Sequence, residues 1–129
     1  MSTSTSRKAA RRQALYLLYQ WDLTGQELAS LYEGEPDAFA RALAEAVTAR
    51  ADDLDRRITA ASPDWPADRL GTLERNILRI GVYELEEHSV PREVAINEAV
   101  VLAKRYASED AGRLVNGVLG KIAREEEAA

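Results

Sequence analysis

The chain has 129 residues, of which 46% are hydrophobic and 30% charged, and this composition supports one folded domain rather than a disordered polymer. It contains no cysteine and a single histidine, His88, which excludes disulfides, thiol nucleophiles and thiolate metal sites and argues against structural zinc. The formal net charge of -5 argues against a protein that coats nucleic acid with its whole surface.

Proline and glycine divide the chain into segments with helical periodicity, and none of these segments alternates as a strand does. The short connections between them are typical of antiparallel neighbours in one bundle. In chain order we expect helices or helical turns at residues 6–23, 26–33, 39–61, 67–70, 72–88, 91–106 and 110–123. The predicted fold class is all-α, a compact bundle of about seven helices, with residues 1–129 in a single domain and flexible tails at 1–5 and 125–129.

The longer segments each carry an apolar face that we expect in the core. Three glycines interrupt the last helix at a cost of about 1 kcal/mol each relative to alanine. Close approach of another helix, or of a ligand, is the simplest account of Gly112, Gly117 and Gly120. The expected core residues are Ala14, Leu17, Leu18, Trp21, Phe39, Leu43, Val47, Leu54, Ile58, Ala61, Leu73, Ile77, Leu78, Ile80, Leu85, Val94, Ala95, Val101, Leu102, Tyr106, Leu114, Val115, Val118, Leu119 and Ile122.

The sequence contains no recognisable catalytic site. His88 is the only side chain that titrates near neutrality, and it lies at the expected end of a helix, where a cation stabilises the helix dipole by about 0.3 to 1 kcal/mol. No glycine-rich phosphate loop follows a strand, because no strand is expected. We therefore expect a protein that is not an enzyme and that needs no cofactor and no metal.

The first helix begins with a cluster of cations: Arg7, Lys8, Arg11 and Arg12 fall within six positions. Like charges four residues apart on a helix destabilise it, and surface ion pairs contribute only about 0 to 1 kcal/mol each. Phosphate binding is a stronger reason for such a cluster, and Tyr16 offers a stacking face for an unpaired base. From the residues alone, RNA binding and a solvated, ion-paired helix face stay as alternatives, with single-stranded RNA favoured over duplex DNA.

Three stretches resemble the NusB family: LERNILRIGVYEL at 73–85, VP at 90–91 followed by VAINEAV at 94–100, and NGVL at 116–119. With the basic start that leads into ALY at 14–16, the resemblance covers most of the chain. It implies an all-helical transcription antitermination factor that binds boxA RNA together with the ribosomal protein NusE. It further implies that the pair joins RNA polymerase complexes that transcribe ribosomal RNA operons.

The resemblance also implies roles for individual residues. The RNA-binding set is Arg7, Lys8, Arg11, Arg12, Tyr16, Asp110 and Arg113, and the partner-binding set is Glu74, Tyr83 and Glu84. Two positions depart from the family pattern, since Leu114 stands where some members carry phenylalanine and Gly120 replaces a common aspartate. Asn97 and Asn116 are interpreted as buried residues that join helices, because an unpaired interior amide costs about 1 to 3 kcal/mol.

Other classes of function stay open at this point. The alternative is a helical protein-interaction module, or a ribosome-maturation factor without direct specific RNA binding. NusB-like domains also precede some RNA methyltransferases, but no methyltransferase domain follows in this sequence. No segment has the length and apolarity of a membrane span or signal peptide, so we expect a soluble cytoplasmic protein, with a homodimer left open.

Overall fold

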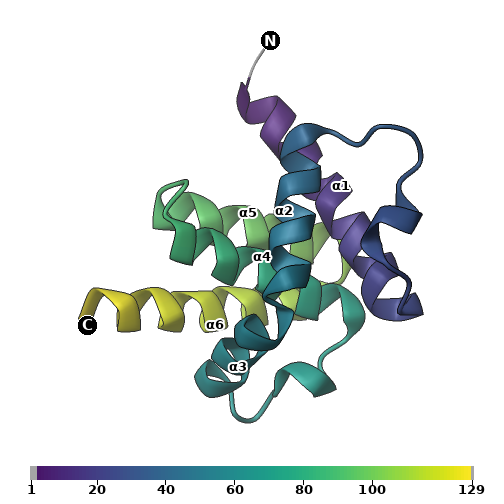
Figure 1. Ribbon diagram of the computed structural model, residues 1–129. Helices are drawn as coiled ribbons and strands as arrows, with labels where there is room; N and C mark the ends of the chain where they lie inside the picture. Colours follow the sequence, from purple (N-terminus) through teal and green to yellow (C-terminus); the bar gives the residue numbers. More distant parts are fainter. Residues whose placement is uncertain (1–2, 129) are drawn as a thin grey trace. The chain divides into compact units, whose positions relative to one another are not determined.

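The computed structural model describes the backbone of residues 3–128 and the side chains of residues 7–128. This part of the chain contains six α-helices, two short 3-10 helices and no strand (Figure 1), which confirms the all-α class and gives eight helical elements where about seven were expected. The elements are α1 (Thr3–Thr24), η1 (Leu28–Leu31), α2 (Ala38–Ala49), α3 (Ala51–Ala61), η2 (Ala67–Arg69), α4 (Thr72–Glu87), α5 (Arg92–Tyr106) and α6 (Glu109–Ala128). None of the described helices is long and apolar enough to cross a membrane.

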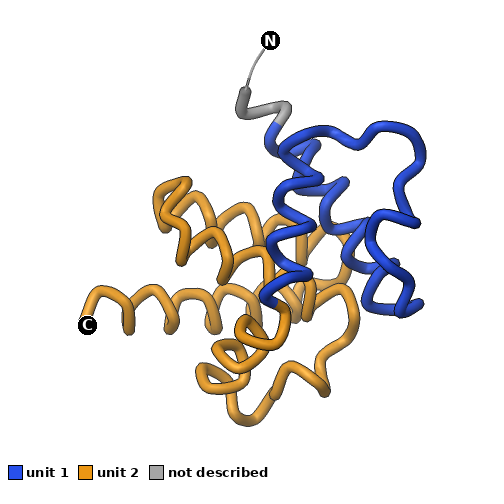
Figure 2. Tube along the Cα trace, in the orientation of Figure 1, with its two compact units in different colours: residues 1–50 blue, residues 51–129 orange. Residues whose placement is uncertain are grey.

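The chain divides into two compact units, residues 1–50 and 51–129 (Figure 2). The boundary interrupts the helix that the sequence predicted over residues 39–61, so that prediction was wrong. Arg50 caps the end of α2 with φ -115° and ψ 14°, and its N–H donates to the Ala46 carbonyl at 3.2 Å. Buried residues continue at helical spacing through the break, with Val47 before it and Ala51 and Leu54 after it. Apolar periodicity alone therefore does not reveal the break.

Unit 1 is built from α1, η1 and α2, which pack on one another. α2 begins at a capped end, because the Asp37 carboxylate accepts a hydrogen bond from the Ala40 N–H at 3.0 Å. The side chain of Gln13 on α1 accepts a hydrogen bond from the Asp37 N–H at 3.2 Å, which ties the start of α2 to α1. The buried apolar residues are Ala10, Ala14, Leu15, Leu17, Leu18, Leu28, Ala40, Leu43, Ala44 and Val47.

Unit 2 has α4 at its centre, packed against α3, α5 and α6, as its wide apolar face predicted. Two glycines allow the close packing. A Cβ on Gly81 would lie 2.5 Å from the Leu119 side chain of α6, and a Cβ on Gly112 would lie 2.6 Å from the Lys104 side chain of α5. Close helix approach therefore explains Gly112, but Gly117 has nothing within 4 Å of such a Cβ in the described structure.

Ion pairs connect the helices of unit 2. Arg79 on α4 makes two 2.7 Å contacts with the Asp55 carboxylate of α3, and its Nη1 donates to Asn76 Oδ1 at 2.9 Å. Arg57 on α3 contacts Glu86 at 2.6 Å and Glu126 at 3.4 Å. Residues 125–128, which the sequence predicted as part of a flexible tail, form the last turn of α6.

The expected core face of α5 was partly wrong. Val94, Val101 and Tyr106 are 40%, 47% and 42% exposed. The residues that α5 buries are Ala95, Ala99, Leu102 and Ala103. Small side chains let α5 pack closely against its neighbours, so three alanines are buried beside Leu102 while two valines and a tyrosine are exposed.

Two asparagines were also misplaced. Asn97 on α5 and Asn116 on α6 are exposed rather than buried, so neither joins helices from the interior. Asn76 on α4 is the buried asparagine instead, and its amide donates to the Thr72 carbonyl of the same helix at 2.8 Å.

Candidate functional site

The basic cluster of unit 1 lies on the first turns of α1, and its four cations differ in exposure. Arg7, Lys8 and Arg12 are exposed, whereas Arg11 is only 4% exposed. The guanidinium carbons of Arg7 and Arg11 lie 5.0 and 6.0 Å from the centre of the Phe39 ring at the start of α2. Phe39, which the sequence predicted as a core residue, is only partly buried and contacts both arginines by cation–π interaction.

A second face of α1 carries the other two cations. Lys8, Arg12 and Tyr16 follow one another at four-residue steps, so they line up along one side of the helix. Tyr16 is 60% exposed, which leaves its ring free to stack on a planar group. The sequence places all four cations at one end of one helix, and the structure separates an exposed row, Lys8 and Arg12, from a pair that contacts an aromatic ring.

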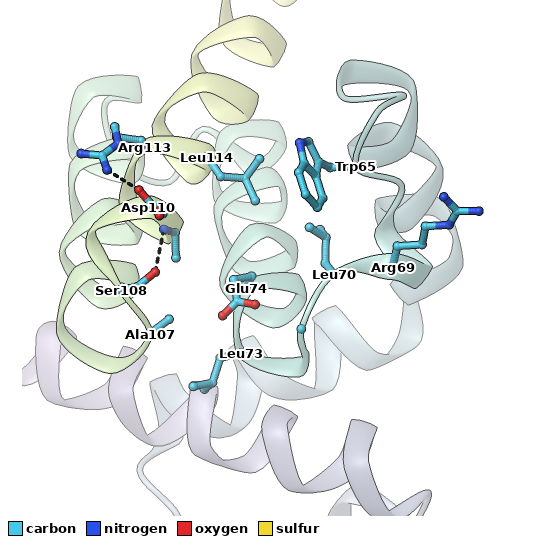
Figure 3. A pocket seen from close by; sticks show the side chains of 12 residues that line it. Trp65, Arg69, Leu70, Leu73, Glu74, Ala107, Ser108, Asp110, Arg113 and Leu114 are labelled. Carbon is cyan, nitrogen blue, oxygen red and sulfur yellow. Dashed lines mark hydrogen bonds and ion pairs between the residues drawn. The ribbon is translucent and has the colours of Figure 1, made fainter.

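Unit 2 holds a pocket of about 730 Å³ between η2, the start of α4 and the junction of α5 with α6 (Figure 3). Trp65, Leu70 and Leu114 point toward one another and form its apolar walls, and Glu74 lies on α4 between them and Ser108. Trp65 is 57% exposed, which is unusual for so large an apolar ring. In the sequence Trp65 lies between Pro63 and Pro66, a pattern that indicates a turn and by itself no binding site.

One rim of the pocket is the first turn of α6. Ser108 caps that helix, since its Oγ accepts a hydrogen bond from the Ala111 N–H at 3.0 Å. Asp110 and Arg113 form an ion pair with each other, and both side chains are largely exposed. The structure thus brings together three of the residues that the resemblance singled out, Glu74, Asp110 and Arg113.

The Glu74 carboxylate folds back over the start of α4. A Cβ on Gly71, the residue that caps this helix, would lie 2.2 Å from Glu74 Oε2, so the absence of a side chain at Gly71 leaves the space that the carboxylate occupies. Within residues 7–128 the structure records no hydrogen bond or ion pair to this carboxylate. Glu74 is therefore available to a group from outside the chain.

The other two residues of the expected partner-binding set lie elsewhere. Glu84 is 2% exposed and Tyr83 is half-buried, and both already take part in interactions within the chain. Ten residues separate Glu84 from Glu74 on α4, which is about 15 Å along a helix. The structure does not gather these three residues into one surface.

A row of exposed cations and an apolar pocket with a free carboxylate are features of a helical protein that binds other macromolecules. His88, the candidate for acid–base chemistry, is an exposed helix end with φ 54°, whose N–H donates to the Glu84 carbonyl. No group of three or more His, Cys, Asp or Glu side chains that could hold a metal ion occurs in the described part of the chain.

Comparison with known proteins identifies the class more narrowly. The chain belongs to the NusB family, whose model matches residues 8–124. The transcription antitermination protein NusB of Myxococcus xanthus is 37% identical over 92% of this chain and 94% of its own length. That of Dictyoglomus thermophilum is 42% identical over 94% of this chain and 86% of its own.

A solved structure extends this likeness to the fold. The crystal structure of the antitermination factors NusB and NusE in complex with dsRNA contains a chain that is 35% identical to this one, with a TM-score of 0.81 over 92% of this chain and 96% of that chain. The family resemblance seen in the sequence is confirmed. The expectation that the protein is not an enzyme is confirmed through the family, whose members are antitermination factors.

Proposed function

We propose that this chain is a transcription antitermination factor that binds boxA RNA together with NusE. The likeness to a NusB that was solved with NusE and RNA, over nearly the whole chain, is the observation that carries the proposal. Entry of the pair into RNA polymerase complexes on ribosomal RNA operons is part of the proposal, as is action in the cytoplasm, where bacterial transcription takes place.

The RNA-binding role rests on the exposed cations of α1. Lys8, Arg12 and Tyr16 share a helix face on which cations bind phosphates and a ring stacks on a base. Arg7 can bind phosphate with the edge of its guanidinium while one face stays on Phe39, because stacking and bidentate hydrogen bonding use different parts of the group. Arg11 is covered, so its proposed contribution is to support this arrangement.

In unit 2, Asp110 and Arg113 are the proposed RNA contacts. A phosphate that approaches Arg113 competes with Asp110 for the guanidinium, so the aspartate tunes the affinity of this arginine for RNA. Glu74 and Tyr83 are the proposed contacts with NusE. Glu84 is buried, and we assign it the role of holding α4 in place beneath them.

RNA affinity measured with and without NusE tests the proposal. Fluorescence anisotropy with a labelled single-stranded boxA oligonucleotide should show modest binding by the chain alone and tighter binding when NusE is added, because two surfaces then share one ligand. A scrambled oligonucleotide is the control. The same sequence annealed into a duplex tests our expectation that single strands are preferred, since the solved relative was crystallised with dsRNA.

Absence of boxA binding under both conditions would contradict the proposal. If NusE bound in that case, the chain would be a protein-interaction module. Sedimentation of the chain alone, over a range of concentrations, decides whether a homodimer forms.

A further inference from the structure

We propose that the outward face of α6, which carries Arg113, Lys121 and Arg124, binds the phosphate backbone of RNA that lies outside the boxA segment. The inference rests on the proposed function for RNA binding itself and for the part that Arg113 takes in it. It adds a second phosphate-binding surface, in unit 2, and gives Gly117 a role.

The spacing of these residues places them on one side of α6. Arg113, Gly117, Gly120 and Arg124 follow one another at steps of four, three and four residues, and Lys121 lies one turn after Gly117. Eleven residues separate Arg113 from Arg124, which is about 16 Å along a helix. The residues buried on the opposite side are Val115, Val118, Leu119 and Ile122.

Charge is the first reason for the proposal. Lys121 and Arg124 are exposed, and among the described residues neither of them makes an ion pair or a hydrogen bond. Of the glutamates at the end of α6, Glu126 and Glu127 pair with arginines of α3 and α5. Glu125 makes no ion pair with Lys121, one turn before it, in the described structure. The N–H donors of both cations are therefore open to an anion.

Gly117 is the second reason. Glycine inside a helix is less stable than alanine, so packing or a ligand has to favour it. Packing does not, because a Cβ at Gly117 would have nothing within 4 Å in the described structure. A Cβ at Gly120 would lie 3.3 Å from Nη1 of Arg124, so this guanidinium lies over the second glycine. An external group can thus approach the backbone at Gly117 and meet a cation on either side.

The chemistry of this face favours the RNA backbone over RNA bases or a protein. None of the large apolar or aromatic side chains that are exposed in the described structure belongs to α6. A protein interface is organised around such side chains, and bases stack on rings. Contacts between cations and phosphates carry no sequence information, so the face suits nucleotides of any sequence on either side of boxA.

Fluorescence anisotropy with two RNAs tests the proposal. One is the boxA oligonucleotide, and the other is the same oligonucleotide extended by a uridine tract at either end. The unmodified chain should bind the extended RNA more tightly. Joint replacement Lys121→Gln and Arg124→Gln should weaken binding of the extended RNA about 25-fold at 0.1 M salt and lower its salt slope by about 1.4, because each phosphate contact with a single strand contributes about 0.7. Binding of the boxA oligonucleotide alone should stay unchanged.

Arg41→Gln combined with Arg56→Gln is the matched control. It also removes two exposed positive charges, but both of these arginines face carboxylates of their own helices. This variant should bind the extended RNA as the unmodified chain does, which excludes an effect of net charge alone.

Gly117→Gln separates binding from folding. Glutamine is a better helix former than glycine and its Cβ meets open space, so the melting temperature should rise. Its side chain covers the backbone between the cations, so affinity for the extended RNA should fall severalfold. A variant that is more stable and still binds the extended RNA as tightly as the unmodified chain would contradict the contact at Gly117.

The outcomes are distinguishable. If the unmodified chain does not bind the boxA oligonucleotide with or without NusE, the proposed function fails. If it binds and the uridine tracts add no affinity, or add it equally in the Lys121→Gln and Arg124→Gln variant, the α6 surface is wrong and the proposed function stands. If that variant instead loses affinity for NusE and keeps its affinity for the extended RNA, the face contacts protein and the present assignment is overturned.

Discussion

In unit 1 the arginines of α1 lie on the surface or against the Phe39 ring, whereas in unit 2 Arg57 and Arg79 connect helices through carboxylates. The residue type is the same, but the surroundings differ. Arg7, which stacks on the Phe39 ring, and Arg12, which faces solvent, have N–H donors that an incoming phosphate can reach. An arginine that already donates its N–H groups to a carboxylate of the same chain uses those donors to stabilise the fold.

The comparison shows why a count of cations does not locate an RNA-binding surface. α3 carries the adjacent pair Arg56 and Arg57, yet the structure pairs Arg56 with Asp53 and Arg57 with two glutamates. In α1, no acidic residue precedes Asp22, so the cations there have no carboxylate within the next turns of their own helix. The position of carboxylates along the helix, rather than the number of cations, is the informative feature.

The largest effect is expected from Arg79→Ala in unit 2. It should lower the free energy of unfolding by about 3 to 5 kcal/mol, because it leaves the partly buried Asp55 carboxylate without its cation. Urea denaturation followed by circular dichroism measures the loss. The RNA affinity of the Arg79→Ala variant, measured under conditions in which the variant is folded, should equal that of the unmodified chain.

Arg56→Ala is the matched control for that experiment. Arg56 also forms an ion pair with an aspartate, but its side chain is 72% exposed, so we expect a change of less than about 1 kcal/mol. Equal losses of unfolding free energy in the two variants would show that burial of the ion pair does not decide how much an arginine stabilises this fold.

The second effect concerns unit 1. Joint replacement of Arg7, Lys8 and Arg12 by alanine should weaken RNA binding about 100-fold at 0.1 M salt, because each phosphate contact with a single strand contributes about 0.7 to the slope of affinity against salt. The slope should fall by about two units in the same measurement. Stability should not fall, since like charges are removed from one helix end. An unchanged slope would show that these cations do not contact phosphates.

Most of the fold follows from the sequence, because periodicity, glycine and proline mark the helices directly. The break at Arg50 does not follow, since apolar spacing continues through it and no glycine or proline marks it. The exposure of Val94, Val101 and Tyr106 on α5 does not follow either. Ala95 and Ala99 are buried because close helix packing favours small side chains, and this depends on the neighbouring helices rather than on α5 itself.

The two candidate sites differ in how far the sequence predicts them. The cations of α1 are adjacent in the chain and can be recognised without a structure. The pocket joins Trp65, Glu74 and Leu114, whose proximity depends on tertiary packing. An aromatic residue between two prolines was the available signal, because a rigid turn at a surface has no packing reason to carry so large a ring.

A smaller effect tests the link between Phe39 and the arginines. Phe39→Leu keeps an apolar side chain on α2 and removes the aromatic face, so RNA affinity should fall about two- to fivefold, which is the 0.5 to 1 kcal/mol of an exposed cation–π contact. Phe39→Tyr should restore it. A purely packing role would instead lower the melting temperature and leave RNA affinity unchanged in both variants.

The smallest effect is expected at the end of α6. Glu126 contacts Arg57 at 3.4 Å, but its Oε2 is buried without a hydrogen-bond partner in the described structure, so desolvation offsets most of the ion pair. Glu126→Gln should therefore change the free energy of unfolding by less than about 0.5 kcal/mol. Glu86→Gln should cost more, because Glu86 contacts the same guanidinium at 2.6 Å and is less exposed. If thermal denaturation showed the opposite order, the last turn of α6 would be the main anchor of Arg57, and the acidic end of the chain would be as much a part of the fold as Asp55.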